Sequence, residues 1–366
     1  MAGIYYLILV IGFAVYSYAL TVSQFSNLTS GIWDDWNQSN PENVKHDSFA
    51  MESGNGNLWL VSRRLYRKSF DDPWDPASRG GIVSSFQLST NTWTHTPYNR
   101  LDEDQYGDKL FSLNDRLFML TYSTNQRKIG YHKLFFWSDE TKQWLETPFD
   151  IDPAASTLSS NEIQSLSVSV PDPNGKVAYF VASAHAYAQR GSEMVFSKLD
   201  VEFRGNVPVK AVLKPIAREE SMEPSGVVFT ALKDNVLYAF IQNFYSEGYV
   251  PISDFAYAIN LKTNRVGNVT LGGAPPPMDF DADRMFQTKD QMFIVGGRQM
   301  FGLGEVRQVR DIWSLDLTTF QWRGTNSMLP ETAGNFFYHS ITYDRHGGKL
   351  YYGDLKEGIS VAQVSA

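Results

Sequence analysis

The sequence of 366 residues contains no cysteine. Disulfides, thiolate metal sites and cysteine nucleophiles are therefore all excluded. A chain of this length with 43% hydrophobic residues can bury a large core without covalent cross-links, so the lack of cysteine does not argue against secretion.

Clustered positive charge is also missing. The chain has 32 Lys and Arg against 40 Asp and Glu, a net charge of −8, and no basic block. Phosphate binding needs clustered Lys and Arg, so we expect no nucleic-acid partner. The six histidines are scattered without paired spacing, which leaves no zinc motif and no catalytic triad. We expect no cofactor.

The sequence does contain a strand-and-turn module, and weaker copies of it recur along the chain. Its clearest copy runs from Gln291 to Trp322: a short apolar run, Gly296-Gly297, a polar loop, an alternating strand and a tight turn. A threonine three residues before a large apolar residue occurs in four places, at Thr90, Thr141, Thr263 and Thr319.

Turn chemistry gives this recurrence a physical reason. Three residues before those threonines stand Gln87, Ser138, Asn260 and Asp316. An Asp, Asn or Ser opens a tight turn by hydrogen-bonding nearby backbone, and the threonine closes it. We expect the large apolar residue that follows the turn to pack on the neighbouring unit.

The spacing of these anchors, roughly 50 to 60 residues, is typical of propellers and similar arrays. The module resembles the kelch repeat, in which an apolar strand enters Gly-Gly and an aromatic, Asp, Thr and Trp follow at fixed offsets. Only the copy from Gln291 to Trp322 carries the whole signature. The resemblance implies an all-β, six-bladed propeller of four-stranded blades, with another all-β repeat as the alternative.

The blades are expected at residues 46–97, 110–147, 163–209, 227–271, 285–323 and 331–366, the last completed by 22–36. The stretch from Gly31 to Trp36 looks like an outer strand without a blade, and the chain ends in three strands. We therefore expect the N-terminal strand to join the last blade and close the ring, which removes exposed sheet edges. No second domain is expected.

The apolar run from Ile4 to Leu20, with small residues at Ser17 and Ala19, predicts a signal peptide over residues 1–19. Residues 20–366 would then form one secreted, extracellular, monomeric propeller without membrane contact. The run has no Lys or Arg before it and approaches membrane-spanning length, so a retained type II anchor in the secretory pathway is the alternative. Entry into that pathway makes three asparagines candidate glycosylation sites: Asn27, Asn37 and Asn268.

The longest connections join the second and third strands of the expected blades. In an up-and-down blade they lie on the same face as the connection to the next blade, and they are rich in Tyr, Trp and Arg, the residues that dominate recognition surfaces. The binding candidates are Arg64, Tyr66, Trp74, Arg127, His185, Tyr187, Tyr245, Tyr249, Arg298 and Phe301. The competing interpretation is that these segments are only solvated, variable connections.

A weak metal candidate lies at Asp279, Asp281 and Asp283, which resemble the start of a calcium loop. Arg284 stands where that pattern needs glycine, so a simple blade connection is the favoured interpretation. Copper oxidases that resemble galactose oxidase need a tyrosine cross-linked to cysteine, so the lack of cysteine argues against that activity. The sialidase-type Ser-x-Asp-x-Gly-x-Thr-Trp repeat is also absent.

These observations favour a non-catalytic module that binds a protein or a glycan. A carbohydrate-active enzyme of epimerase or lyase type is one alternative, because such a site at the mouth of the propeller channel needs only Arg, His, Glu and Tyr converging from several loops. A structural component of an extracellular matrix or coat is the other.

Overall fold

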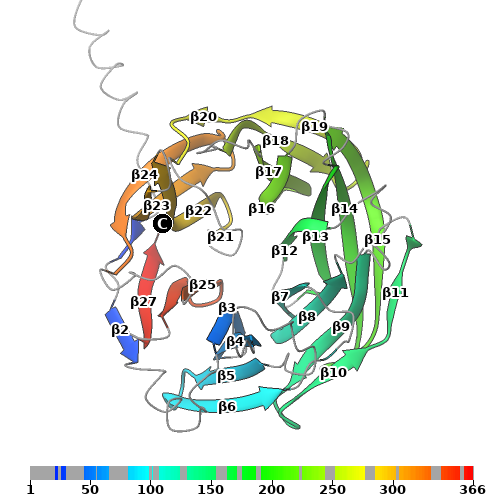
Figure 1. Cartoon of the computed structure of the whole chain (residues 1–366), viewed down its shortest axis with the longest axis vertical. Helices are drawn as coiled ribbons and strands as arrows, with labels where there is room; N and C mark the ends of the chain where they lie inside the picture. Colours follow the sequence, from blue (N-terminus) through cyan, green and yellow to red (C-terminus); the bar gives the residue numbers. More distant parts are fainter. Residues whose placement is uncertain are drawn as a thin grey trace, which may run out of the picture.

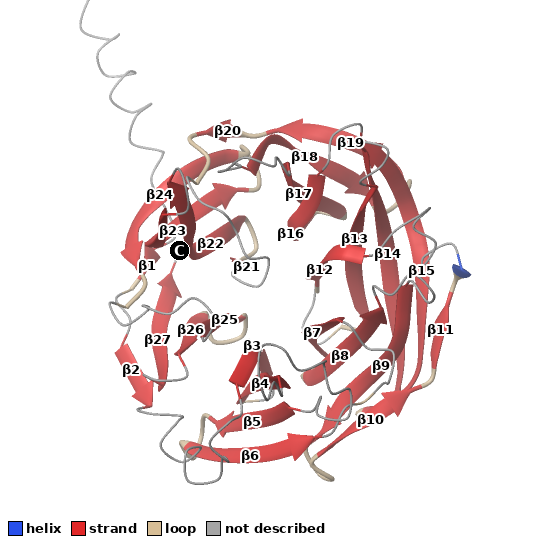
Figure 2. Cartoon of the chain, in the orientation of Figure 1, coloured by secondary structure: helices blue, strands red, loops and turns tan. Residues whose placement is uncertain are grey.

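The computed structural model describes residues 21–23, 26–29, 45–54, 56–65, 81–98, 101, 107–123, 130–153, 163–170, 175–186, 191–221, 225–243, 252–276, 285–301, 305–330, 339–354 and 358–365. Within these ranges all regular structure is β, apart from one helical residue at Pro153, and no helix could cross a membrane. Six small sheets surround a central axis as blades (Figures 1 and 2). The predicted six-bladed, all-β propeller is confirmed.

Each blade is an up-and-down sheet that runs from the axis outwards. Blade 1 consists of β3 (Lys45–Gly54), β4 (Asn57–Leu65), β5 (Gly81–Gln87) and β6 (Thr92–Tyr98). Blade 2 consists of β7 (Gly107–Leu113), β8 (Arg116–Ser123), β9 (Gly130–Ser138) and β10 (Gln143–Thr147). Blade 3 consists of β12 (Ile163–Ser169), β13 (Val177–Ala186), β14 (Gly191–Arg204) and β15 (Val207–Ser221), with β11 (Phe149–Ile151) on its outer edge.

The second half of the ring repeats this order. Blade 4 consists of β16 (Ser225–Lys233), β17 (Val236–Asn243), β18 (Ile252–Asn260) and β19 (Arg265–Thr270). Blade 5 consists of β21 (Met285–Gln287), β22 (Gln291–Phe301), β23 (Glu305–Asp316) and β24 (Gln321–Met328), with β20 (Gly272–Gly273) on its outer edge. Blade 6 consists of β25 (His339–Asp344), β26 (Lys349–Asp354) and β27 (Gly358–Ser365).

The N-terminal part of the described chain completes blade 6. Two short strands, β1 (Thr21–Val22) and β2 (Ser26–Thr29), pair antiparallel with β27. The Ser327 hydroxyl of blade 5 donates a 2.6 Å hydrogen bond to the Val22 carbonyl, which ties the closing strand to the neighbouring blade. The predicted closure of the ring by the N-terminal strand is confirmed.

The described strands that close the ring, β1 and β2, precede the stretch from Gly31 to Trp36 that the sequence favoured. That stretch lies outside the described ranges, so its place stays a prediction. Val22 and Leu28 supply apolar side chains beside β27. Val22 is 5% exposed, and Leu28 packs in the cluster that contains Ile359.

The core lies mainly between neighbouring blades. Phe111 of blade 2 packs edge-on against Phe180 of blade 3, with ring centroids 5.3 Å apart. Trp144, the large residue after the blade 2 turn, packs on Trp137 and reaches Tyr98 of blade 1 at 6.0 Å. Buried aromatic pairs of this kind contribute about 0.5–1.5 kcal/mol beyond their buried area. For Trp144, the expected packing against the neighbouring unit is confirmed.

The recurring turns have the predicted chemistry. The Asp316 carboxylate accepts hydrogen bonds from the backbone N–H groups of Thr318 and Thr319, at 2.7 and 3.0 Å. Asn260 does the same for Thr263 at 3.1 Å. In each turn the residue after the threonine has positive φ: Asn91, Lys142, Asn264 and Phe320.

Candidate functional site

The ring has two different ends. At one, which we call the turn end, the tight turns between first and second strands meet those between third and fourth strands. In blade 1, for example, the Leu88 N–H donates to the Gly56 carbonyl across 3.0 Å. At the other, which we call the loop end, β4, β13 and β22 reach their carboxyl ends, and the longer connections to the third strands begin.

Four of the ten predicted binding residues belong to described strands that finish at the loop end. Arg64 is the penultimate residue of β4, His185 holds the same place in β13, and Arg298 and Phe301 lie in the last part of β22. The other six lie outside the described residues: Tyr66, Trp74, Arg127, Tyr187, Tyr245 and Tyr249.

The strand pairs at the loop end are long and regular. The ladder of blade 5 continues from Gly297 opposite Val309 to Phe301 opposite Glu305. The ladder of blade 3 continues to Ala186 opposite Gly191. Paired backbone therefore fixes where these connections leave the ring.

The predicted modification and metal residues are only partly described. Asn268 is exposed on β19, the outer strand of blade 4, and Asn27 lies in β2. Asn37 lies outside the described residues, and so do Asp279, Asp281 and Asp283. Among the residues that the structure describes, no group of three His, Asp or Glu could hold a metal ion.

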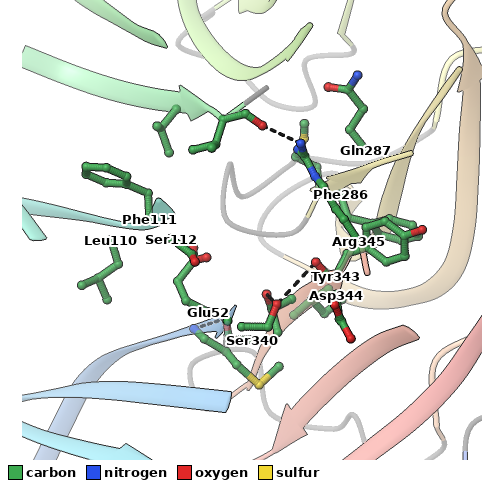
Figure 3. A pocket seen from close by; sticks show the side chains of 18 of the residues that line it. Glu52, Leu110, Phe111, Ser112, Phe286, Gln287, Ser340, Tyr343, Asp344 and Arg345 are labelled. Atoms are coloured by element: carbon green, nitrogen blue, oxygen red, sulfur yellow. Dashed lines mark hydrogen bonds between the residues drawn. The ribbon is translucent and has the colours of Figure 1, made fainter. Parts of the chain in front are cut away.

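A cavity of about 460 Å³ lies on the axis and extends to the turn end (Figure 3). Residues of all six innermost strands line it, on β3, β7, β12, β16, β21 and β25. The sequence analysis did not find this cavity. A signal was present in the alternating hydroxyl residues of two first strands, Ser167 with Ser169 and Ser340 with Thr342.

Hydroxyl and amide side chains around the cavity join one blade to the next. Ser340 accepts a 3.0 Å hydrogen bond from the Met51 N–H, which links blades 6 and 1. Ser167 and Thr230 share a 3.2 Å hydrogen bond between blades 3 and 4. These bonds satisfy polar groups on strands whose inner edge has no further strand beside it.

Arg345 crosses the mouth of the cavity. It lies in the turn after β25 of blade 6, and its Nη1 donates a 2.5 Å hydrogen bond to the carbonyl of Val170, just after β12 of blade 3. Blades 6 and 3 stand on opposite sides of the axis (Figure 1). Beside it, burial raises the pKa of Tyr343, which also lines the cavity.

Comparison with solved structures identifies the fold and nothing finer. A phage phi92 endosialidase is similar at TM-score 0.51 and 7% identity, over 94% of this chain and 69% of that one. A fungal alcohol oxidase in complex with copper gives TM-score 0.42 at 10% identity, over 94% of this chain and 76% of that one. The β-propeller domain of the trilobed protease from Pyrococcus furiosus gives TM-score 0.39 at 9% identity, over 87% of this chain and 81% of that one.

Neither the protein-family models nor the curated proteins compared with the sequence match it. Membership of the kelch family therefore stays a prediction, whereas the six-bladed propeller itself is observed.

Proposed function

We propose that this protein is a secreted, kelch-like propeller that binds a protein or a glycan at its loop end, without catalysis. The observation that carries the proposal is the common placement of Arg64, His185, Arg298 and Phe301 in strands that finish at this end. The adjoining connections are rich in Tyr, Trp and Arg, which are the residue types that contribute most to binding energy at interfaces.

The rigidity of the ring supports this proposal. Hydrogen bonds between blades, such as Ser340 to Met51 and Gln287 to Leu232, hold the scaffold that carries the connections. A fixed scaffold lowers the ordering cost of binding, which is about 0.5–1.5 kcal/mol for each flexible side chain that must be immobilised. Recognition loops on a rigid sheet framework are a common way to build a binding surface.

Secretion is part of the same proposal. Cleavage after Ala19 would leave Leu20 as the first residue, so the closing strand that begins at Thr21 would be kept whole. Asn268 is exposed on an outer strand and therefore accessible to a glycan. Expression in a secreting eukaryotic host, followed by N-terminal sequencing and glycosidase treatment, tests both points. A chain that stays in the membrane with Met1 attached would instead support the type II anchor.

Affinity capture of the secreted protein, with mass spectrometry of what accompanies it, tests the binding function. The loop-end variant combines Arg64→Ala, Arg298→Ala and Phe301→Ala. Its matched control at the turn end combines Arg204→Ala, Arg323→Ala and Val207→Ala, all of exposed residues. We expect the captured partner to be lost only from the loop-end variant. Equal retention by both variants would contradict the proposal.

The same preparation tests the carbohydrate-active enzyme and the structural component. Turnover of oligosaccharides would favour the enzyme, and incorporation into an insoluble matrix would favour the structural role.

A further inference from the structure

We propose that the cavity on the axis is a second binding site, open at the turn end, for a small uncharged molecule rich in hydroxyl groups, such as a monosaccharide. This site is separate from the loop end and does not depend on the function proposed there. The inference rests on the size of the cavity, the chemistry of its walls and the arginine across its mouth.

The size is suitable for a small organic ligand. Sites for such ligands usually occupy about 300–1,000 Å³, and this cavity occupies about 460 Å³. The innermost strands of all six blades surround it (Figure 1), and some of their lining side chains are drawn in Figure 3, so its shape is fixed by the fold.

The walls present neutral polar groups. Ser53, Ser112, Ser169 and Thr342 line the cavity together with the bridging hydroxyls Ser167 and Ser340. A hydroxyl both donates and accepts hydrogen bonds, so such a wall complements a molecule that carries several hydroxyls of its own.

The charges around the cavity favour an uncharged ligand. Charges of both signs line it: the carboxylates of Glu52, Asp115 and Asp344, and the basic groups of Lys109 and Arg345. An anion would meet the carboxylates and a cation would meet the basic groups, whereas a neutral polyol can hydrogen-bond to both.

One side of the cavity is aromatic. Phe286 and Tyr343 both line it, with ring centroids 5.0 Å apart. Phe286 is 4% exposed and already stacked on Phe293, so the ring that can receive the C–H face of a sugar is the half-buried Tyr343, whose hydroxyl adds a polar end.

Arg345 covers this site. Its hydrogen bond to the Val170 carbonyl spans the mouth, so a ligand that enters from the turn end has to displace the guanidinium first. Because the side chain is exposed and belongs to a turn, its replacement should leave the blades intact.

The test is saturation-transfer NMR of the full chain with glucose, galactose, N-acetylglucosamine and myo-inositol, followed by calorimetry with each probe that responds. We expect at least one probe to bind and Ser169→Ala to weaken its affinity about fivefold, the equivalent of one net hydrogen bond. Arg345→Ala should accelerate both association and dissociation. The matched control is Ser197→Ala, because Ser197 is also a buried serine but does not line the cavity.

The loop-end variant with Arg64, Arg298 and Phe301 replaced separates this site from the function proposed above. It should bind the probe as the unchanged protein does. Absence of saturation transfer from every probe, in both the unchanged protein and Arg345→Ala, would mean that the cavity holds water only. Binding unaltered in Ser169→Ala, or lost in the loop-end variant, would place the sugar elsewhere; each of these results overturns the proposal.

Discussion

Val22 lies directly opposite Val364 in an antiparallel pair, although the two valines come from opposite ends of the described chain. Val22 is 5% exposed and packs in the cluster that contains Leu350, Ile341 and Val364. Because the contact joins the two ends of the ring, the apolar burial at Val22 should stabilise the whole propeller and not only the first strand.

Val22→Asp tests this stabilisation by placing an unpaired charge where β1 pairs with β27. We expect the free energy of unfolding to fall by at least about 3 kcal/mol, measured by urea denaturation, because a buried charge without a partner is strongly destabilising. Ser26→Asp adds the same charge at an exposed position of β2 and should cost little. Equal stabilities of the two variants would show that closure contributes little to the fold.

Gly296 should be intolerant of any side chain. It has φ +63° and lies where the pairing of β22 with β23 shifts register between Val295 and Gly297. An added Cβ would lie 2.7 Å from Leu329 Cδ1 and 3.2 Å from the Val309 carbonyl oxygen. We expect Gly296→Ala to lower the free energy of unfolding by about 1–3 kcal/mol, from backbone strain and crowding together.

The matched control for Gly296 is Gly267→Ala. An added Cβ at Gly267 has no atom within 4 Å, and no positive φ occurs there. A thermal melt of both variants compares them directly. An unchanged melting temperature for Gly296→Ala would contradict the strain and crowding expected at Gly296.

The turn residue Asp316 should stabilise blade 5 through its side chain. Asp316→Ala removes the acceptor of two backbone N–H groups, those of Thr318 and Thr319. Each such hydrogen bond contributes about 1 kcal/mol net, so we expect a loss of about 1–2 kcal/mol in chemical denaturation. Asp316→Asn keeps an acceptor oxygen and should recover most of the loss. A similar loss in both variants would show that charge, and not the turn geometry, is responsible.

The turns were the part of the structure most accessible from the sequence. The Asp316 side chain accepts from backbone N–H groups two and three residues away, so the turn pattern can be read locally, and its recurrence indicated the number of blades. The contribution of residues 21–29 to ring closure was harder to predict, because their pairing with β27 joins distant parts of the chain and no local pattern shows it.

The cavity could not be predicted for the same physical reason. Its hydroxyls come one or two from each of five innermost strands, and a serine in a strand has the same local pattern whether it faces the axis or a neighbouring blade. The Arg345 contact with Val170 joins residues 175 positions apart, and no local rule connects a turn to the opposite side of a ring. The loop-end candidates could be placed on a strand end from the blade pattern, but their contacts depend on several blades at once.

Tyr351 should make the stability of the propeller depend on pH in the alkaline range. Burial, with a smaller contribution from the Asp344 carboxylate, raises the pKa of Tyr351 to about 12. An unfolded tyrosine has a pKa of about 10. Between these two pKa values the unfolded chain has lost the Tyr351 proton while the folded chain keeps it. The free energy of unfolding should therefore be unaffected by this group below pH 10 and fall as the pH rises from about 10 to about 12.

The measurement is urea denaturation at intervals from pH 9 to pH 12, comparing the unchanged protein with Tyr351→Phe. Tyr238, which is buried, and Tyr343, which is half-buried, also have raised pKa values, so both proteins should lose stability and the difference between their slopes reports Tyr351. The variant should show the shallower slope, because it has no hydroxyl to titrate. Asp344→Asn should lower the pKa of Tyr351 by removing the nearby charge, and an absorbance titration near 295 nm would detect this. Parallel slopes for the unchanged protein and Tyr351→Phe would show that Tyr351 ionises as readily in the folded chain as in the unfolded one.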